Sequence, residues 1–198
     1  MNRKLRTIDL TLAGMFVALM AIGANITTFA PFMVVGGVPI TLQTFFAILA
    51  GAILGSRVGA ISMTVYALVG LVGVPVFARF GAGLSSIVSP TFGFIVSFIF
   101  TAYITGKIVE KHKGVKTYIF AAIVGMIVNY VFGTNWMYAA YKLWAQAPEG
   151  FTYKLAWAWM VVPLPKDIIL AVCAGMMAHR LEKSVLSKSA FRNLNRAA

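Results

Sequence analysis

Residues 10 to 56 contain no Asp, Glu, Lys or Arg, and most of them are apolar. A helix that crosses the hydrocarbon of a bilayer needs about 20 consecutive apolar residues, so this stretch has room for two such helices. A break near its middle is supplied by Pro31, Gly36, Gly37 and Pro39. The whole chain is 60% hydrophobic and 11% charged, whereas about 25% of the residues in soluble domains are charged. We therefore interpret the chain as an integral membrane protein.

The rest of the chain divides at glycines, prolines and charges in the same way. The Gly-rich segment GAGLSSIVSPTFGF is not a plain spanning helix, and non-helical backbone at membrane depth survives only where it is buried or lines a cavity. We expect this segment to line an outward-facing pocket. The predicted fold is an all-α membrane protein with six transmembrane helices in one compact bundle. The expected helices are about 10–28, 41–54, 58–72, 90–107, 117–141 and 163–180, within a membrane domain over 1–182 that precedes a basic cytoplasmic tail over 183–198.

The basic residues are unevenly distributed over this topology. Six spans put both termini on one side, and the loops on that side hold most of the 17 Lys and Arg. Because basic loops are retained in the cytoplasm, both termini are predicted to be cytoplasmic. The four tryptophans flank the opposite loop between the last two helices, as an interfacial belt would. The net charge of +12 follows from this topology, so we do not expect nucleic-acid binding.

Asp167 is the unusual acid of the chain, because it lies about one turn inside the last predicted helix, next to Lys166. An ionised side chain at membrane depth is costly unless it is paired or functional. One interpretation is a snorkelling Lys166 beside a helix-capping Asp167. The other is ligand contact, in which Asp167 would accept N–H groups and Lys166 would suit a carboxylate.

Further polar residues fall in the outer segments. Arg79 precedes the Gly-rich segment and fits an interfacial arginine or a pocket cation. Thr41 and Gln43 open the second helix, as a polar cap or as pocket groups. Asn129 interrupts an apolar run, where it suits interhelical hydrogen bonding as well as ligand contact.

Small residues recur four positions apart at Gly51, Gly55 and Gly59, and at Gly14 and Ala18. This spacing lets helices approach closely, inside the bundle or against another membrane protein.

Motifs of common enzymes do not occur in the sequence. Without GxxxxGK[ST], HExxH or GxSxG, we expect neither phosphate-loop ATP hydrolysis nor the usual metalloprotease or hydrolase chemistry. The single cysteine, Cys173, excludes a disulfide framework and a metal site built on several thiolates. We expect no catalysis, no cofactor and no metal in this chain.

The order GGVPITLQTF, GAILGSRVGA, YALVGLVGVPVFA, SPTFGF and PLPKD resembles the BioY family of biotin-binding S components of energy-coupling factor (ECF) transporters. The resemblance runs from about Leu10 to Arg180, and VPITLQT and GVPVFA are its most specific parts. It implies a multi-pass subunit of a bacterial cell membrane with a vitamin pocket near the outer face. It also implies a membrane-embedded coupling subunit and two ATPase subunits as partners, and those partners would bind ATP and Mg.

The sequence departs from the pattern of the family at two places. Where the family often has Gly-Pro-Thr-Gly-Gly, residues 89–93 read SPTFG, and the lysine often found three residues after the acid of the last helix is replaced by Leu170. Whether Lys166 takes the place of that cation stays open, because adjacent helical residues point in different directions. Gly14 and Ala18 match the small-residue pair that the family is thought to use for docking to the coupling subunit.

We predict a high-affinity biotin-binding membrane subunit that mediates uptake together with an ECF energising module. Asp167 would accept the ureido N–H groups, Arg79 or Lys166 would neutralise the valerate carboxylate, and aromatic side chains would pack on the fused rings. The alternatives are an S component for another vitamin, a small membrane enzyme with Asp167 and Lys166 as acid and base, and a structural membrane subunit. The predicted substrate-binding residues are Asp167, Lys166, Arg79, Gln43, Thr41, Tyr66, Phe77, Thr91, Phe92 and Asn129.

Overall fold

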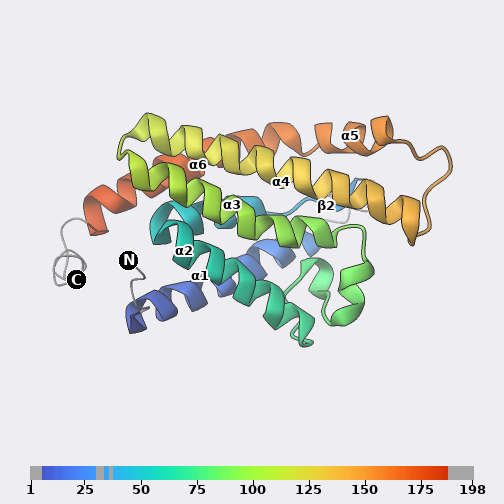
Figure 1. Ribbon diagram of the computed structural model, residues 1–198, viewed down its shortest axis with the longest axis horizontal. Coiled ribbons are helices and arrows are strands. Elements are labelled where there is room, and N and C mark those ends of the chain that lie inside the picture. Colours follow the sequence, from blue (N-terminus) through green and yellow to red (C-terminus); the bar gives the residue numbers. More distant parts are fainter. Residues whose placement is uncertain (1–5, 30–33, 36–37, 187–198) are drawn as a thin grey trace.

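The computed structural model describes residues 6–29, 34–35 and 38–186, and these residues form a bundle of helices (Figure 1). A two-residue antiparallel pair, β1 (Val34–Val35) and β2 (Val38–Pro39), precedes the second helix. Four short helical turns are η1 (Ile26–Phe29), η2 (Ala78–Phe80), η3 (Leu84–Val88) and the π-turn η4 (Glu182–Leu186). The helices are α1 (Thr7–Asn25), α2 (Gln43–Leu71), α3 (Phe92–Lys111), α4 (Val115–Leu143), α5 (Tyr153–Val161) and α6 (Leu164–Leu181).

The long element α2 is two helices that reverse at Gly55. Gly55 has φ 83° and ψ 172°, which is not a helical conformation. A Cβ placed on Gly59 would lie 2.9 Å from the Cα of Gly51, although a straight helix would separate these two residues by about 12 Å. The two halves therefore fold back against each other, and glycine is needed where they touch.

Small residues also join this hairpin to its neighbours. A side chain at Gly51 would collide with the backbone of Ala102 on α3, and one at Gly106 would collide with the backbone of Ser56. Gly51 and Gly59, two of the glycines singled out for close approach, thus act inside the bundle. Glu110 caps the reversed half, because its carboxylate accepts hydrogen bonds of 2.7 Å from Ser56 N and 2.9 Å from Ser56 Oγ.

The six predicted helices correspond to α1, the two halves of α2, α3, α4 and α6. Helix α1 ends at Asn25, and the chain continues to Phe29 as the 3₁₀ turn η1. Helix α5 was not predicted. It meets the start of α6 at a bend of 56°, where Pro163 and Pro165 flank the junction. The predicted break at Pro31, Gly36 and Gly37, and residues 187–198 of the predicted tail, lie outside the described residues.

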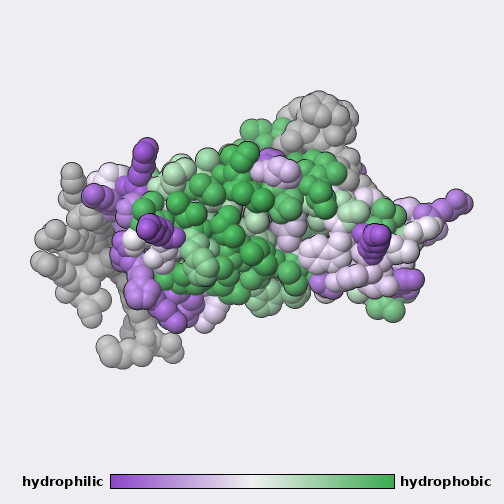
Figure 2. Space-filling model, turned by 90° about the horizontal axis from the view of Figure 1, so that it is seen from above, coloured by the Kyte–Doolittle hydropathy of each residue, from purple (hydrophilic) through white to green (hydrophobic). Residues whose placement is uncertain are grey.

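The membrane-spanning potential of the described helices rests on length and composition. Helices α1, α2, α3 and α4 are long and apolar enough to cross a membrane, and the bent pair of α5 with residues 164–184 makes a fifth candidate. Figure 2 shows an apolar surface over the middle of the molecule, with hydrophilic residues gathered toward both ends. This distribution is the one that a bilayer imposes on a multi-pass protein.

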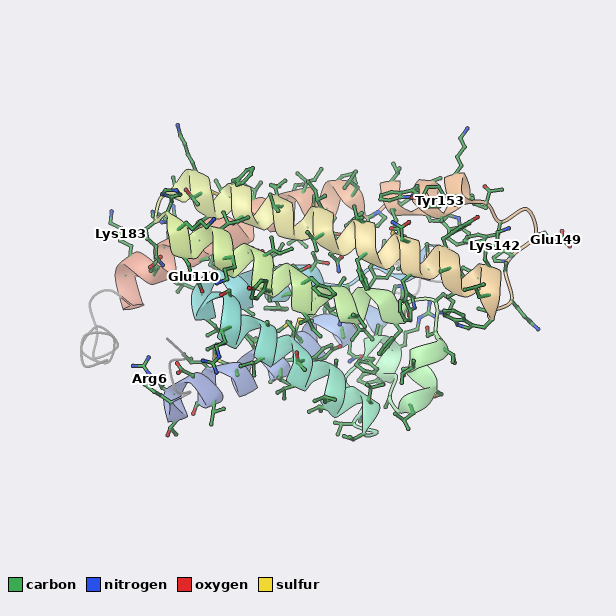
Figure 3. The ribbon with its side chains drawn as sticks, in the orientation of Figure 1. Arg6, Glu110, Lys142, Glu149, Tyr153 and Lys183 are labelled. Carbon is green, nitrogen blue, oxygen red and sulfur yellow. The ribbon has the colours of Figure 1, made fainter. Side chains whose placement is uncertain are left out.

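The two polar ends of the bundle differ in what they contain (Figure 3). One end holds Arg6, Glu110 and Lys183, close to where the described chain begins and ends. The other holds Lys142 and Glu149, together with the turns of residues 72–91. The core between them contains fully buried side chains of Met20, Ile48, Met63, Tyr66, Tyr118 and Met137.

Candidate ligand-binding pocket

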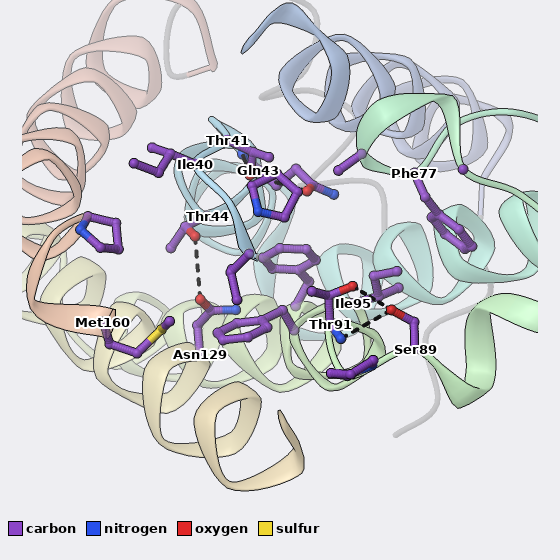
Figure 4. A pocket seen from close by; sticks show the side chains of 18 of the residues that line it. Ile40, Thr41, Gln43, Thr44, Phe77, Ser89, Thr91, Ile95, Asn129 and Met160 are labelled. Atoms are coloured by element: carbon purple, nitrogen blue, oxygen red, sulfur yellow. Dashed lines mark hydrogen bonds between the residues drawn. The ribbon is translucent and has the colours of Figure 1, made fainter. Parts of the chain in front are cut away.

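A cavity of about 310 Å³ lies in the half of the bundle that contains residues 38–44 and 77–91. Its walls come from β2, the start of α2, the turns before α3, and the facing sides of α3, α4 and α6 (Figure 4). Pockets for small molecules occupy about 300 to 1,000 Å³ and are largely apolar with a few polar groups. The volume suits one compact organic molecule.

The carboxylate of Asp167 is the central polar group of this cavity. It is in the first turn of α6, where the helix dipole favours an anion, and only 7% of the residue is exposed. Its Oδ2 accepts a hydrogen bond of 2.6 Å from the hydroxyl of Tyr130 on α4. Its Oδ1 lies 2.7 Å from Lys166 Nζ as an ion pair but receives no hydrogen bond of good geometry. One carboxylate oxygen is thus paired with Tyr130 and the other with Lys166, and each oxygen keeps a further acceptor site.

Lys166 is held by two partners across the pocket. Its Nζ donates a hydrogen bond of 2.6 Å to the carbonyl oxygen of Thr41 and forms the ion pair with Asp167. This arrangement ties α6 to the segment that opens α2. The ammonium group therefore satisfies groups of the protein itself, at a position on the cavity lining.

A second polar cluster lies where α2 begins. The side-chain amide of Gln43 donates to the Tyr66 hydroxyl at 2.7 Å, and that hydroxyl donates to the carbonyl oxygen of Val76 at 2.9 Å. Thr41 Oγ1 donates to Gln43 Oε1 at 3.2 Å. The cluster connects both halves of α2 to the turn before Phe77, which fixes the position of the pocket wall.

A third polar cluster crosses the pocket from α2 to α4 and α3. Thr44 Oγ1 donates to Asn129 Oδ1 at 3.4 Å, as Figure 4 shows, and Asn129 Nδ2 donates to Ser97 Oγ at 2.6 Å. Both amide ends of Asn129 are thus occupied by interhelical hydrogen bonds. Of the two roles that the sequence allowed for Asn129, the structure shows the interhelical one, at a position on the pocket lining.

Arg79 lies at the rim of the cavity on a turn of unusual backbone conformation. Arg79 and Phe80 have φ of 60° and 56°, and such left-handed conformations cost on the order of 1–3 kcal/mol each in residues other than glycine. The turn is closed by a hydrogen bond of 3.0 Å from Phe77 N to Gly81 O. Among the residues that the structure describes, none forms an ion pair or hydrogen bond with the Arg79 guanidinium.

The apolar lining of the cavity is rich in rings. Phe77 packs edge-on against Tyr66 with 5.6 Å between ring centroids, and the remaining apolar walls are Phe94, Ile95, Phe98, Tyr141 and Met160. Ser89 and Thr91, at the entry to α3, add hydroxyl groups that hydrogen bond to each other at 2.9 Å. Flat apolar walls with isolated polar groups suit a compact heterocycle with a few hydrogen-bonding edges.

Eight of the ten predicted binding residues line the cavity, namely Asp167, Lys166, Arg79, Gln43, Thr41, Phe77, Thr91 and Asn129. The structure does not bring Tyr66 and Phe92 to the lining. Tyr66 is fully buried behind Gln43 and Phe77. Phe92 points toward Trp136, with 6.1 Å between the rings, and Phe94, two positions later, faces the pocket in its place.

Sequence reasoning missed Tyr130, Tyr141 and Met160 on the lining. Tyr130 carried a signal, because it directly follows Asn129 in the same apolar run. Tyr141 and Met160 carried none, since aromatic and methionine residues are common throughout the chain.

Gly14 and Ala18 on α1 do not line this cavity, and both are exposed. A Cβ on Gly14 would meet no atom of the described chain within 4 Å. Helix α1 is also the least buried of the four long apolar helices, at 28% against 50% for α3. The structure thus places this pair on an open outer surface.

The described chain contains no group of three or more His, Cys, Asp and Glu that could hold a metal ion. What the cavity offers instead is one carboxylate, two basic groups, several amides and hydroxyls, and aromatic walls. This set can recognise a neutral polar heterocycle and an anionic group by hydrogen bonds and charge.

Fold and site together define a multi-pass membrane protein with a pocket for a small molecule among its helices. A crystal structure of the S component for biotin from an ECF-type ABC transporter has the same fold, with a TM-score of 0.72 over 93% of this chain and 95% of that chain, at 22% identity. The family model for the BioY family matches residues 1–187, so the chain belongs to the BioY family.

Relatives of this family extend over nearly the whole chain. The chain is 43% identical over 192 residues to BioYB of Bacillus subtilis, covering 96% of this chain and 95% of that protein. It is 35% identical over 181 residues to the biotin transporter BioY of Rhodobacter capsulatus, covering 87% and 92%. It is 32% identical over 172 residues to the biotin transporter BioY of Thermotoga maritima, covering 86% and 94%.

Proposed function

We propose that this protein is the biotin-binding S component of an ECF transporter, and that it mediates biotin uptake without catalysis of its own. The observation that carries the proposal is the buried Asp167 carboxylate in an aromatic-lined cavity of about 310 Å³, with one oxygen held by Tyr130 and the other paired with Lys166. The names of the relatives from Rhodobacter capsulatus and Thermotoga maritima support biotin as the ligand.

Asp167 accepts the ureido N–H groups of biotin in this proposal. An ionised carboxylate is an acceptor only, so it matches a ligand edge that carries donors. Tyr130 donates to Oδ2 and Lys166 pairs with Oδ1, and each carboxylate oxygen can accept a further hydrogen bond. Gln43 and Asn129 add amide groups nearby, and Phe77 and Phe94 provide apolar surfaces for the fused rings.

Arg79 is the cation that neutralises the valerate carboxylate. Its guanidinium has no protein partner among the described residues, whereas Lys166 is already engaged by Asp167 and the Thr41 carbonyl. A guanidinium can also hold a carboxylate through two parallel hydrogen bonds. Lys166 then serves to orient Asp167 and to tie α6 to residues 41–43.

The proposed partners are a membrane-embedded coupling subunit and two ATPase subunits, which would bind ATP and Mg. The exposed Gly14 and Ala18 on α1 form the docking surface for the coupling subunit, because small exposed residues let a partner helix approach closely. Both termini face the cytoplasm of a bacterial cell in this proposal. The excess of basic residues in the loops on the side of the termini supports that orientation.

The test is equilibrium binding of a vitamin panel to the purified protein. Biotin is expected to bind tightly, while thiamine, riboflavin and pantothenate are not. Asp167→Asn is expected to weaken biotin binding by about 10- to 100-fold, since a hydrogen bond to a charged group contributes roughly 1.5–3 kcal/mol. Glu149→Gln, at an exposed acid outside the cavity, is the control and should bind like the wild type. Tight binding of another vitamin instead of biotin would overturn the substrate assignment.

A further inference from the structure

The backbone turn that carries Arg79 is held by a residue from a different helix. The amide N–H of Phe80 donates a hydrogen bond of 2.7 Å to Oδ1 of Asn25, the last residue of α1. Asn25 is 7% exposed, and its own Nδ2 donates to the carbonyl oxygen of Ala21 at 3.0 Å. The Asn25 side chain thus forms one hydrogen bond to its own helix and a second to the turn that carries Arg79.

The turn needs this hydrogen bond because its backbone conformation is unfavourable. Arg79 and Phe80 are consecutive non-glycine residues with φ of 60° and 56°, and this region is sparsely populated for residues with a Cβ. The hydrogen bonds from Phe77 N to Gly81 O and from Gly81 N to Ala78 O close the turn at its base. The Asn25 side chain is the contact from α1 that reaches its tip.

Strained backbone persists only where the surroundings over-determine it, and it is common at ligand clamps. Without the bond to Asn25, the Phe80 N–H would lose its partner and both residues could relax to negative φ. The guanidinium of Arg79 would then leave its position at the rim of the cavity, although Asn25 itself is not on the cavity lining.

We propose that Asn25 is a positioning residue for ligand binding: it locks the Arg79–Phe80 turn in the left-handed conformation and thereby keeps the Arg79 guanidinium directed to the ligand carboxylate. The inference rests on the proposed function for the identity of the ligand. It does not rest on that function for the state of the turn, which can be measured without any ligand.

The ligand-free measurement is the rate at which trypsin cuts the Arg79–Phe80 peptide bond in the purified, detergent-solubilised protein, followed by mass spectrometry. A protease cuts a loop only when it opens, so the rate reports the open population. Asn25→Leu removes the acceptor at similar volume and should speed cleavage at this bond by about tenfold or more, the effect of one lost hydrogen bond to a buried group.

A matched control variant makes this measurement specific. Asn135→Leu is the matched control, because Asn135 Nδ2 also donates to the backbone carbonyl four residues earlier, at 2.7 Å, and the residue lies outside the cavity lining. It should leave the cleavage rate at Arg79 unchanged.

Biotin affinity then tests whether Asn25 acts through Arg79. Asn25→Leu should weaken binding by about tenfold in the wild type and cause no further loss in an Arg79→Ala background. Unchanged cleavage in Asn25→Leu would overturn the proposal, and so would equal losses of affinity with and without Arg79. A wild type that binds no biotin would refute the proposed function, while the cleavage rates would still decide whether Asn25 locks the turn.

Discussion

The hydroxyl of Tyr130 on α4 lies 2.6 Å from Oδ2 of Asp167 on α6 and donates a hydrogen bond to it. The bond joins two helices on the lining of the cavity and occupies one of the two carboxylate oxygens. It therefore fixes the orientation of the carboxylate, whose other oxygen pairs with Lys166.

Tyr130→Phe removes this donor and leaves the ring in place. The carboxylate then loses a hydrogen bond worth roughly 1.5–3 kcal/mol in a buried setting, and its orientation is no longer fixed. We expect biotin affinity to fall by about 10- to 100-fold, measured by isothermal titration calorimetry. Tyr103→Phe, at an exposed ring outside the cavity, is the control. Wild-type affinity in Tyr130→Phe would show that the bond does not contribute to binding.

The different roles of Arg79 and Lys166 can be separated with two ligands, biotin and its carboxamide. Arg79→Gln should weaken binding of biotin by about tenfold or more and leave the carboxamide nearly unaffected, because only the acid needs a cation. Lys166→Gln should weaken both ligands to the same extent, because Lys166 Nζ supports Asp167 and Thr41. The opposite pattern would assign the ligand carboxylate to Lys166.

The exposed pair on α1 can be tested by uptake. Gly14→Leu with Ala18→Leu fills the open surface, so we expect biotin uptake in cells that contain the energising subunits to be lost while binding to the purified protein is unchanged. Cys173→Leu makes a similar enlargement at an exposed position of α6 and should transport normally. Normal uptake by the double α1 variant would rule out this surface as the docking site.

The close contact between α2 and α3 predicts a loss of stability. Gly51→Ala places a methyl group against the Ala102 backbone, and overpacking of this kind costs about 1–3 kcal/mol. The melting temperature in detergent should fall by several degrees. Gly14→Ala adds the same methyl group to an open helix surface, where alanine is the better helix former, and should not lower it. Equal melting temperatures for the two variants would contradict the packing described for the α2 hairpin.

The sequence predicted the helices well because membrane spans are set by long uncharged stretches, as at residues 10–56 and 117–141. It did not predict α5, because Tyr153–Val161 is only nine residues long and its aromatic residues fit an interfacial loop equally well. Glycine spacing predicted close helix contact at Gly51 and Gly59. The reversal itself depends on φ at Gly55, and spacing carries no information on that angle.

The site was predictable where a residue type conflicts with its surroundings. Asp167 stood out as an acid inside an apolar run, and the structure places it on the lining of the cavity. Phe92 and Phe94 are both aromatic and two positions apart, so only the register of α3 decides which of them faces the cavity. Asn25 could not be recognised, because its role depends on a turn 55 residues away in the chain.

Native mass spectrometry of the purified protein tests the central claim most directly, because it weighs the ligand that the protein retains from the cell. We predict a bound species whose added mass equals that of one biotin molecule, which Asp167→Asn loses. A retained ligand with the mass of another vitamin, or a protein that stays free after biotin is added, would contradict the account.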